Sequence, residues 1–204
     1  MIINGVDASK FNARENYNQT GKIRCAVVAS MTRPMKGHED FLKAAALTEA
    51  KRSDRMSFFL VGGGHLRPHL EEMAARLGLN GQVHFLGERT DVPSILESID
   101  ILVVPSHSEG MSNALLEAMA AGLPAVATAV DGNNEVVVDQ ETGILVPARD
   151  PEAMSDALLR YLDNPRLMQL HGRNARRRIE EKFTLDQSTE AYLKAYHEAM
   201  DLPD

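Results

Sequence analysis

Short apolar runs alternate along the chain with longer segments of helical periodicity. The runs are rich in β-branched residues, which is typical of strands buried on both faces. Six strands are predicted, at 23–29, 56–61, 82–86, 100–104, 125–129 and 144–146, with helices between them at 38–51, 66–77, 92–97, 112–121 and 134–138. Three further helices, at 152–162, 166–182 and 185–200, close the chain. This alternation predicts an α/β fold with a parallel sheet covered by helices on both faces.

The stretch 101–122 carries the clearest chemical signal. An apolar strand leads through the polar loop 106–111 into a helix that Ser112 can cap. That helix is apolar almost all round, so it is expected to be buried. Its one ionisable residue is Glu117, and a buried carboxylate needs hydrogen-bond donors from the protein or from a ligand. A second carboxylate, Glu109, stands eight positions earlier in the loop.

Between these two carboxylates lies the start of the helix. The backbone N–H groups around Gly110 attract an anion through their free donors and the helix dipole. Carboxylates accept hydrogen bonds from hydroxyl groups, so the stretch suits a ligand that is part phosphate and part sugar, such as a nucleotide sugar. An alternative stays open, in which Glu117 pairs with a buried Arg or Lys and Glu109 is a solvated loop residue.

Other polar loops follow the predicted strands, and ligands of open parallel sheets bind beyond the carboxyl ends of the strands. One site assembled from several loops is therefore expected. Lys36, next to Gly37, follows the first strand and could hold a phosphate. Gly62-x-Gly64-x-x-Arg67 resembles a dinucleotide fingerprint but has Arg where Gly or Ala is required. His65 and His69 share a helical spacing without a third metal ligand, and they are interpreted as surface residues.

Composition narrows the class of protein. The chain has 204 residues, with 22 basic and 29 acidic residues and a net charge of −7, which argues against a nucleic-acid-binding protein. Cys25 is the only cysteine, so no disulfide framework or thiolate metal cluster is expected. No signal peptide or membrane-spanning segment is predicted. The basic run 173–178 could lean on anionic lipid, but a solvated helix face is the favoured interpretation.

The segment SEGMSNALLEAMAAGLPAVAT at 108–128 closely resembles the motif of Glu, seven residues, Glu in family-four retaining glycosyltransferases. The similarity runs almost from end to end of the chain. It includes NGVDASKF at 4–11, MKGHEDFLKA at 35–44, FLVGGG at 59–64, VHFLGERTDV at 83–92 and TGILVPARDPEAM at 142–154. The resemblance implies a Rossmann-like sheet that forms the C-terminal, donor-binding half of a GT-B fold. Residues 1–204 would then be one nucleotide-sugar-binding domain, without the N-terminal acceptor domain.

The resemblance also implies roles for particular residues. Glu117 would accept from the ribose hydroxyls, and Glu109 would contact the donor sugar and stabilise positive charge at its anomeric carbon. Lys36 would hold the donor diphosphate with an Arg that the family has where this chain has Met31, and Arg33 could substitute for it. Backbone groups would serve the phosphate or sugar at Gly110, Met111, Ser112 and Asn113, and the nucleobase at Gly87 and Glu88. Glu109 and Lys36 are thus the catalytic candidates.

The implied activity is the transfer of a hexosyl group from a UDP-sugar or GDP-sugar to an acceptor glycan or lipid-linked sugar, with retained configuration. No metal or other cofactor and no nucleic acid is expected. The complete enzyme would be cytoplasmic, with peripheral contact at the inner face of the membrane as a further expectation. Alternatives are a two-carboxylate hydrolase, a nicotinamide-binding protein, a sugar-nucleotide 2-epimerase of the same fold, and a non-catalytic sugar-nucleotide or protein-interaction module.

Overall fold

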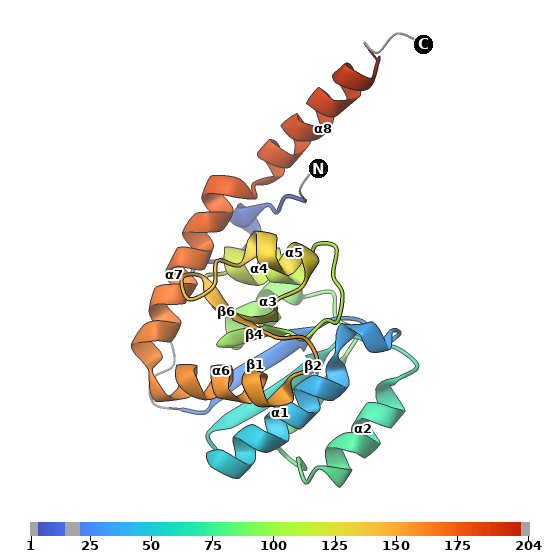
Figure 1. The fold of residues 1–204 in the computed structure, drawn as a ribbon, viewed down its shortest axis with the longest axis vertical. Helices are drawn as coiled ribbons and strands as arrows, with labels where there is room; N and C mark the ends of the chain where they lie inside the picture. The colour runs from blue at the N-terminus through green and yellow to red at the C-terminus, as the bar shows by residue number, and fades with distance from the viewer. Residues whose placement is uncertain (1–3, 15–20, 201–204) are drawn as a thin grey trace.

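The computed structural model describes residues 4–14 and 21–200, and its centre is a six-stranded parallel sheet (Figure 1). The strands are β1 (Ile23–Val28), β2 (Met56–Val61), β3 (Val83–Gly87), β4 (Ile101–Val104), β5 (Ala125–Thr128) and β6 (Gly143–Val146). Their order is β3-β2-β1-β4-β5-β6, and every neighbouring pair is parallel. The predicted fold class and all six predicted strands are confirmed, with ends that differ by one residue at most.

Helices cover both faces of this sheet (Figure 1). They are α1 (His38–Lys51), α2 (Arg67–Arg76), α3 (Val92–Ser98), α4 (Asn113–Ala120), α5 (Asp131–Val136), α6 (Pro151–Asp163), α7 (Pro165–Lys182) and α8 (Leu185–Met200), with short 3₁₀ turns η1 (Ala8–Lys10) and η2 (Pro34–Lys36). Among the described residues, no helix combines the length and the apolarity needed to cross a membrane.

Two hydrophobic cores form because successive side chains of a strand point to opposite faces. On β1, Cys25 and Val27 pack with α1, α2 and α6, whereas Ala26 packs with α3 and α4 on the other side. Helix α7 contributes to both cores, through Met168 to the first and through Ala175 and Ile179 to the second. The thiol of Cys25 is fully buried, and burial raises its pKa, so it is held as a neutral thiol.

Two glycines let the loops at the carboxyl ends of the strands approach closely. Gly37 ends η2 with φ +70°, and a side-chain carbon there would lie 1.9 Å from the carbonyl oxygen of Pro105. A side-chain carbon on Gly132 would lie 1.6 Å from the carbonyl oxygen of Gly110. The loop after β4 is therefore in backbone contact with the loop that precedes α1 and with α5.

The predicted start of the fifth helix was wrong. The prediction was 134–138, but α5 begins at Asp131. Gly and Asn have low helix propensity, which hid this first turn in the sequence. In the structure Gly132 N donates to Glu109 O at 3.1 Å and Asn133 N donates to Val130 O at 2.9 Å, so hydrogen bonds hold these residues in the helix.

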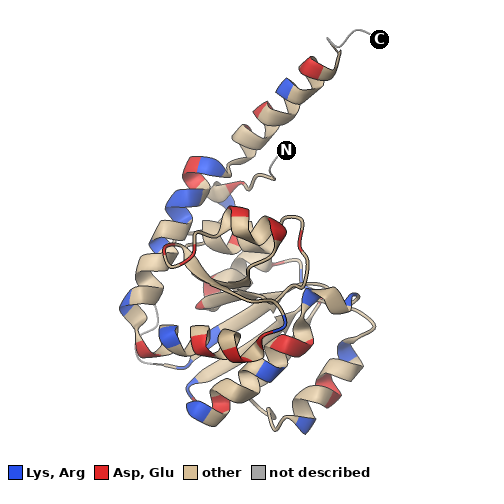
Figure 2. Ribbon diagram, viewed as in Figure 1, with Lys and Arg blue, Asp and Glu red and all other residues tan. Residues whose placement is uncertain are grey.

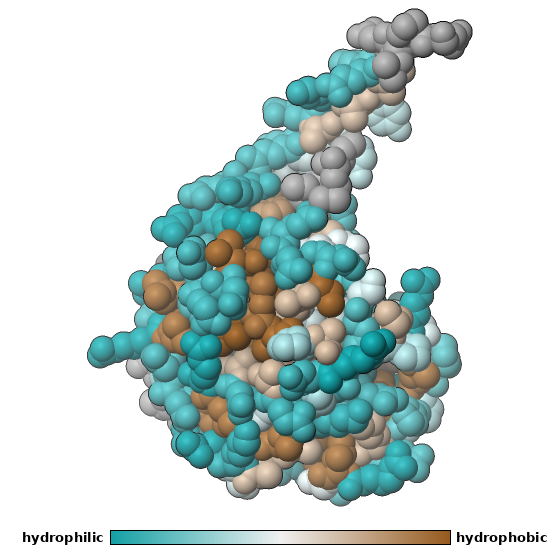
Figure 3. Space-filling view, viewed as in Figure 1, coloured by the Kyte–Doolittle hydropathy of each residue, from teal (hydrophilic) through white to brown (hydrophobic). Residues whose placement is uncertain are grey.

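Helix α8 extends away from the sheet and its covering helices (Figure 1), and none of its residues is buried. The face of α8 that is visible in Figure 3 is mostly hydrophilic. Large apolar side chains are nevertheless exposed along it, at Leu185, Tyr192, Leu193, Tyr196 and Met200. Tyr192 is 45% exposed and Tyr196 is 68% exposed. The spacing of these residues places them along one apolar stripe of the helix.

Candidate functional site

The two catalytic candidates, Lys36 and Glu109, contact each other directly. Lys36 ends η2 in the loop after β1, and Glu109 lies in the loop after β4. Lys36 Nζ lies 2.7 Å from Glu109 Oε2, and Ser106 Oγ donates to the same oxygen at 2.9 Å. The side chains are only 29% and 11% exposed, so this ion pair is better shielded from solvent than a surface pair. The loops that follow β1 and β4 therefore meet at the carboxyl edge of the sheet.

A second contact fastens the Glu109 loop to helix α1. His107 Nε2 lies 2.7 Å from Asp40 Oδ2, and His107 N donates to Met35 O at 2.7 Å. Asp40 is in the first turn of α1 and also lies 3.6 Å from Lys43. No sequence signal connects His107 with Asp40, which is 67 positions away.

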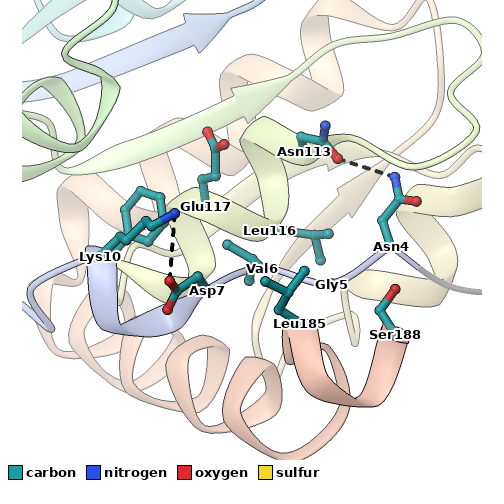
Figure 4. A pocket seen from close by; sticks show the side chains of 11 residues that line it. Asn4, Gly5, Val6, Asp7, Lys10, Asn113, Leu116, Glu117, Leu185 and Ser188 are labelled. Atoms are coloured by element: carbon teal, nitrogen blue, oxygen red, sulfur yellow. Dashed lines mark hydrogen bonds and ion pairs between the residues drawn. The ribbon is translucent and has the colours of Figure 1, made fainter. Parts of the chain in front are cut away.

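The start of helix α4 is capped as predicted, with Ser112 Oγ accepting from Leu115 N at 3.3 Å. The first N–H groups of a helix have no partner within the helix. In residues 4–14 and 21–200, the N–H groups of Gly110, Met111, Ser112 and Asn113 have no acceptor either. The side chain of Asn113 is held by Asn4, whose Nδ2 donates to Asn113 Oδ1 at 3.2 Å (Figure 4). Free donors for an anion are therefore present where the sequence predicted them.

Glu117 projects from the next turn of α4 into a cleft of about 470 Å³ (Figure 4). Asn4, Asp7 and Lys10 line the same cleft, where Lys10 Nζ lies 3.7 Å from Asp7 Oδ2. Glu117 is half-buried, and in the described part of the chain its carboxylate makes no hydrogen bond or ion pair. Burial raises the pKa of this carboxyl group. The alternative in which Glu117 is neutralised by a buried Arg or Lys is not realised among the described residues.

Gly87 and Glu88 lie apart from Glu117, at the end of β3. Glu88 lines a second pocket, of about 460 Å³, together with Ser30, Thr32, Val92 and the glycines 62–64. This pocket lies at the carboxyl ends of β1, β2 and β3. The residue run Ser30 to Lys36 thus lines this pocket at one end and forms the ion pair with Glu109 at the other.

Met31 stands where the family has an Arg beside Lys36, and Arg33 is the candidate substitute. The two side chains differ in their burial. Met31 is fully buried in the core with its backbone hydrogen-bonded to Gly63 and Leu66, so its side chain contributes nothing to the site. Arg33 is exposed, and its guanidinium bonds to no other residue of the described chain. Arg33, three positions before Lys36, therefore keeps a guanidinium without a protein partner among the described residues.

Several weaker sequence signals have structural explanations. Arg67 donates to Glu71 at 2.7 Å and to Phe85 O at 3.3 Å, so it supports β3. His69 pairs with Glu39 at 2.9 Å on the surface, and among the described residues no group of three His, Cys, Asp or Glu side chains could hold a metal ion.

Basic residues gather in the second half of α7 (Figure 2). Arg176 donates to the carbonyls of Ala8 and Phe11 at 3.0 Å, and Arg178 donates to those of Glu135 and Val136 at 2.7 Å. Two of the four arginines in this run therefore hold the fold together, which weakens the interpretation of the run as a lipid-binding surface.

The parallel sheet and the polar loops at its carboxyl edge define a Rossmann-like α/β domain with its candidate site where such domains bind ligands. The chain belongs to the family described as Glycosyl transferases group 1, whose sequence profile matches residues 22–164. The resemblance noted in the sequence is thereby confirmed.

Several curated relatives are more than 30% identical, and two of them illustrate the match. The D-inositol 3-phosphate glycosyltransferase of Salinispora tropica is 36% identical over 177 residues, which cover 82% of this chain and 36% of that enzyme. An Escherichia coli enzyme named UDP-Gal:alpha-D-GlcNAc-diphosphoundecaprenol alpha-1,3-galactosyltransferase is 31% identical over 195 residues, which cover 91% of this chain and 50% of that enzyme. The chain thus spans at most about half the length of these two relatives.

One solved structure shows which part of a longer glycosyltransferase this chain matches. The C-terminal domain of LpcC, a glycosyl transferase group 1 family protein from Francisella tularensis, is 28% identical, with a TM-score of 0.79. The match covers 89% of this chain and 100% of that domain. The chain therefore corresponds to the C-terminal domain of a group 1 glycosyltransferase, which is one half of a GT-B fold.

Proposed function

We propose that this chain is the donor-binding domain of a retaining glycosyltransferase that transfers a hexosyl group from a nucleoside-diphosphate sugar to an acceptor hydroxyl. The observation that carries this proposal is the half-buried carboxylate of Glu117, which is unpaired among the described residues and lies one turn after the free N–H groups of Gly110 to Asn113. Membership of the group 1 family supports the reaction class, and the name of the E. coli relative includes the donor UDP-Gal.

Each part of such a donor has a matching group. The diphosphate accepts hydrogen bonds from the free N–H groups at the start of α4 and meets the positive charge of Lys36, with Arg33 as a second cation. The ribose hydroxyls donate hydrogen bonds to Glu117. They are the donors that this carboxylate lacks among the described residues. The hexosyl group then lies near Glu109.

Donor binding would exchange the partner of Lys36. In the structure Lys36 Nζ contacts Glu109 Oε2 at 2.7 Å. A diphosphate carries more negative charge than a carboxylate, so it competes for the ammonium group. Glu109 is then free to accept from the hydroxyls of the sugar and to stabilise positive charge that develops at the anomeric carbon.

The proposed reaction takes place on one face of the sugar. The bond between the anomeric carbon and the phosphate oxygen breaks, and the acceptor oxygen forms its bond to that carbon on the same face. The proton of the acceptor hydroxyl passes to the leaving phosphate oxygen, which Lys36 and the N–H groups stabilise. Configuration is retained, and neither carboxylate has to act as a nucleophile.

The acceptor side belongs to another part of the enzyme in this proposal. Because the matched relatives are about twice as long or longer, an N-terminal domain would complete the site and cover the apolar stripe of α8. That domain would bring the acceptor, a glycan or a lipid-linked sugar, in the cytoplasm or at the inner face of the membrane. The 204 residues alone should bind donor and turn over almost none, so detectable sugar transfer by the purified chain would contradict this division of labour.

Thermal unfolding in the presence of nucleotide sugars tests the donor site. A ligand that binds only the folded state stabilises it by about 2.7 kcal/mol at a hundredfold excess over the dissociation constant. We expect a shift with GDP-sugars or UDP-sugars that is lost in Glu117→Ala. The control Glu72→Ala, on an exposed face of α2, should keep the shift. Equal shifts in both variants, or none in the unmodified chain, would contradict the proposal.

A further inference from the structure

The pocket at the carboxyl ends of β1, β2 and β3 contains an unpaired acceptor. It measures about 460 Å³, within the range of about 300–1,000 Å³ that is usual for small-molecule sites. Val28, Val61 and Val92 give it apolar lining, and the glycines 62–64 expose backbone that a flat ring can approach. The carboxylate of Glu88 lies over this backbone, with Oε2 3.7 Å from where a side-chain carbon of Gly63 would be.

The neighbouring polar groups are already engaged. Arg89 makes two hydrogen bonds to Asp91, at 2.7 and 2.6 Å, and Arg67 bonds to Glu71. Gly87 O accepts from Gly62 N at 2.8 Å, and Gly63 O accepts from Met31 N at 2.7 Å. Within the described chain Glu88 itself has no hydrogen bond or ion pair. The pocket therefore offers a negatively charged acceptor, and Arg89, which also lines it, is already paired with Asp91.

We propose that Glu88 selects guanine, so that the donor of this domain is a guanosine-diphosphate sugar. This inference rests on the proposed function, because it assumes that the donor base occupies the pocket. Guanine alone among the common bases presents two adjacent N–H donors, at N1 and at the 2-amino group, and a carboxylate accepts both. Uracil presents one N–H between two carbonyl oxygens, and adenine presents an amino group beside an acceptor nitrogen, so each brings an acceptor toward the carboxylate.

The position of the pocket agrees with this assignment. Ser30 and Thr32 line it, and the same loop continues to Lys36, which lies beside Glu109. A base in the pocket and a diphosphate at Lys36 would therefore lie along one continuous loop. The hydroxyls of Ser30 and Thr32 lie 3.1 Å apart and supply a neutral hydrogen-bonding edge that does not discriminate between bases.

Calorimetric titration of the 204-residue chain with GDP, inosine diphosphate, UDP and ADP tests the inference. Inosine diphosphate lacks only the 2-amino group, so it isolates one of the two hydrogen bonds. Hydrogen bonds to charged groups contribute strongly to binding affinity. We therefore expect GDP to bind at least about tenfold more tightly than UDP, with inosine diphosphate between them. In Glu88→Gln the preference for GDP should fall to within about threefold, whereas Glu72→Gln should keep it.

The outcomes separate this inference from the proposed function. Glu88 is exposed, so its replacement by Gln should leave the fold intact, and thermal unfolding without ligand checks this. Binding of UDP or ADP as tightly as GDP, or a GDP preference that survives Glu88→Gln, would overturn the role of Glu88 and leave the donor-binding function standing. Failure of every nucleoside diphosphate to bind the folded chain would overturn both.

Discussion

Lys36 Nζ and Glu109 Oε2 lie 2.7 Å apart, although the two residues are 73 positions apart in the sequence. The contact joins the loop after β1 to the loop after β4, which are neighbouring strands of the sheet. In the structure each of these two charges therefore has the other as its partner. Under the proposed function, a donor would supply replacement partners to both residues, an anion to Lys36 and hydroxyl groups to Glu109.

Replacing Lys36 tests this exchange. Lys36→Ala removes the cation that is proposed to meet the diphosphate, and a charged hydrogen bond of this kind corresponds to about a tenfold or greater loss of affinity. Calorimetric titration with a nucleoside diphosphate measures it. Lys51→Ala is the matched control, because Lys51 also pairs with a carboxylate, at Asp156, but on an exposed surface. Equal affinity of Lys36→Ala and the control would remove Lys36 from the site.

The ionised carboxylate of Glu117 should lower the free energy of unfolding of the domain. Burial raises the pKa of its carboxyl group, so the folded state holds the proton more tightly than the unfolded state. Ionisation therefore disfavours folding above the raised pKa, and the penalty disappears below the ordinary value of 4.5. We expect Glu117→Gln to be more stable than the unmodified chain at pH 7, with a difference that narrows toward pH 4.

Urea unfolding at several pH values measures this difference, with Glu72→Gln as the control on an exposed helix face. A Glu117→Gln variant that is less stable at pH 7 would show that the carboxylate has a stabilising partner. The same variant should bind nucleotide sugars more weakly, since an amide accepts fewer hydrogen bonds than a carboxylate.

Substitution of Gly132 should lower the stability of the domain more than most substitutions near the site. In Gly132→Ala the new carbon would lie 1.6 Å from Gly110 O, so the loop that carries Glu109 has to move away. Overpacking of this kind typically costs about 1–3 kcal/mol. Gly110→Ala is the control from the other side of the same contact, because a carbon there meets nothing within 4 Å. Chemical denaturation compares the two, and equal stability would contradict the close packing of α5 on this loop.

A buried hydrogen bond joins α6 to α7. The hydroxyl of Tyr161 lies 2.8 Å from His171 Nδ1, and both side chains are fully buried. Burial raises the pKa of the Tyr161 hydroxyl, which stays neutral. Tyr161→Phe should cost about 1–3 kcal/mol of unfolding free energy, because it leaves a ring nitrogen of His171 without its partner. Tyr192→Phe, on exposed α8, should change stability little, and a similar cost in both would show that the buried bond contributes nothing.

The sequence predicted the elements well and their contacts less well. Helix α1 was predicted with both ends correct, because its apolar period begins after Gly37 and stops before a polar turn. Ser112 was recognised as a cap from its position alone. Such signals are local, since they depend on a few neighbouring residues.

The contacts that build the site are not local. Lys36 meets Glu109, and His107 meets Asp40, only because β1 and β4 are neighbours and Gly37 lies against Pro105. No pattern along the chain encodes those distances. The same reason explains α5, whose first turn depends on a hydrogen bond to the carbonyl of Glu109 rather than on helix propensity. The separation of Glu117 from Glu88 into two different cavities likewise could not be read from their spacing.

Helix α7 belongs to both hydrophobic cores, with Met168 on one side of the sheet and Ala175 and Ile179 on the other. Neither layer of helices can then detach without breaking contacts of the opposite layer, so the domain should open as one cooperative unit in hydrogen exchange. Helix α8, which follows directly and has no buried residue, lies outside that unit. Its amides should exchange early while the sheet remains closed, which leaves the last helix free to change its packing without loosening the loops that surround Glu109.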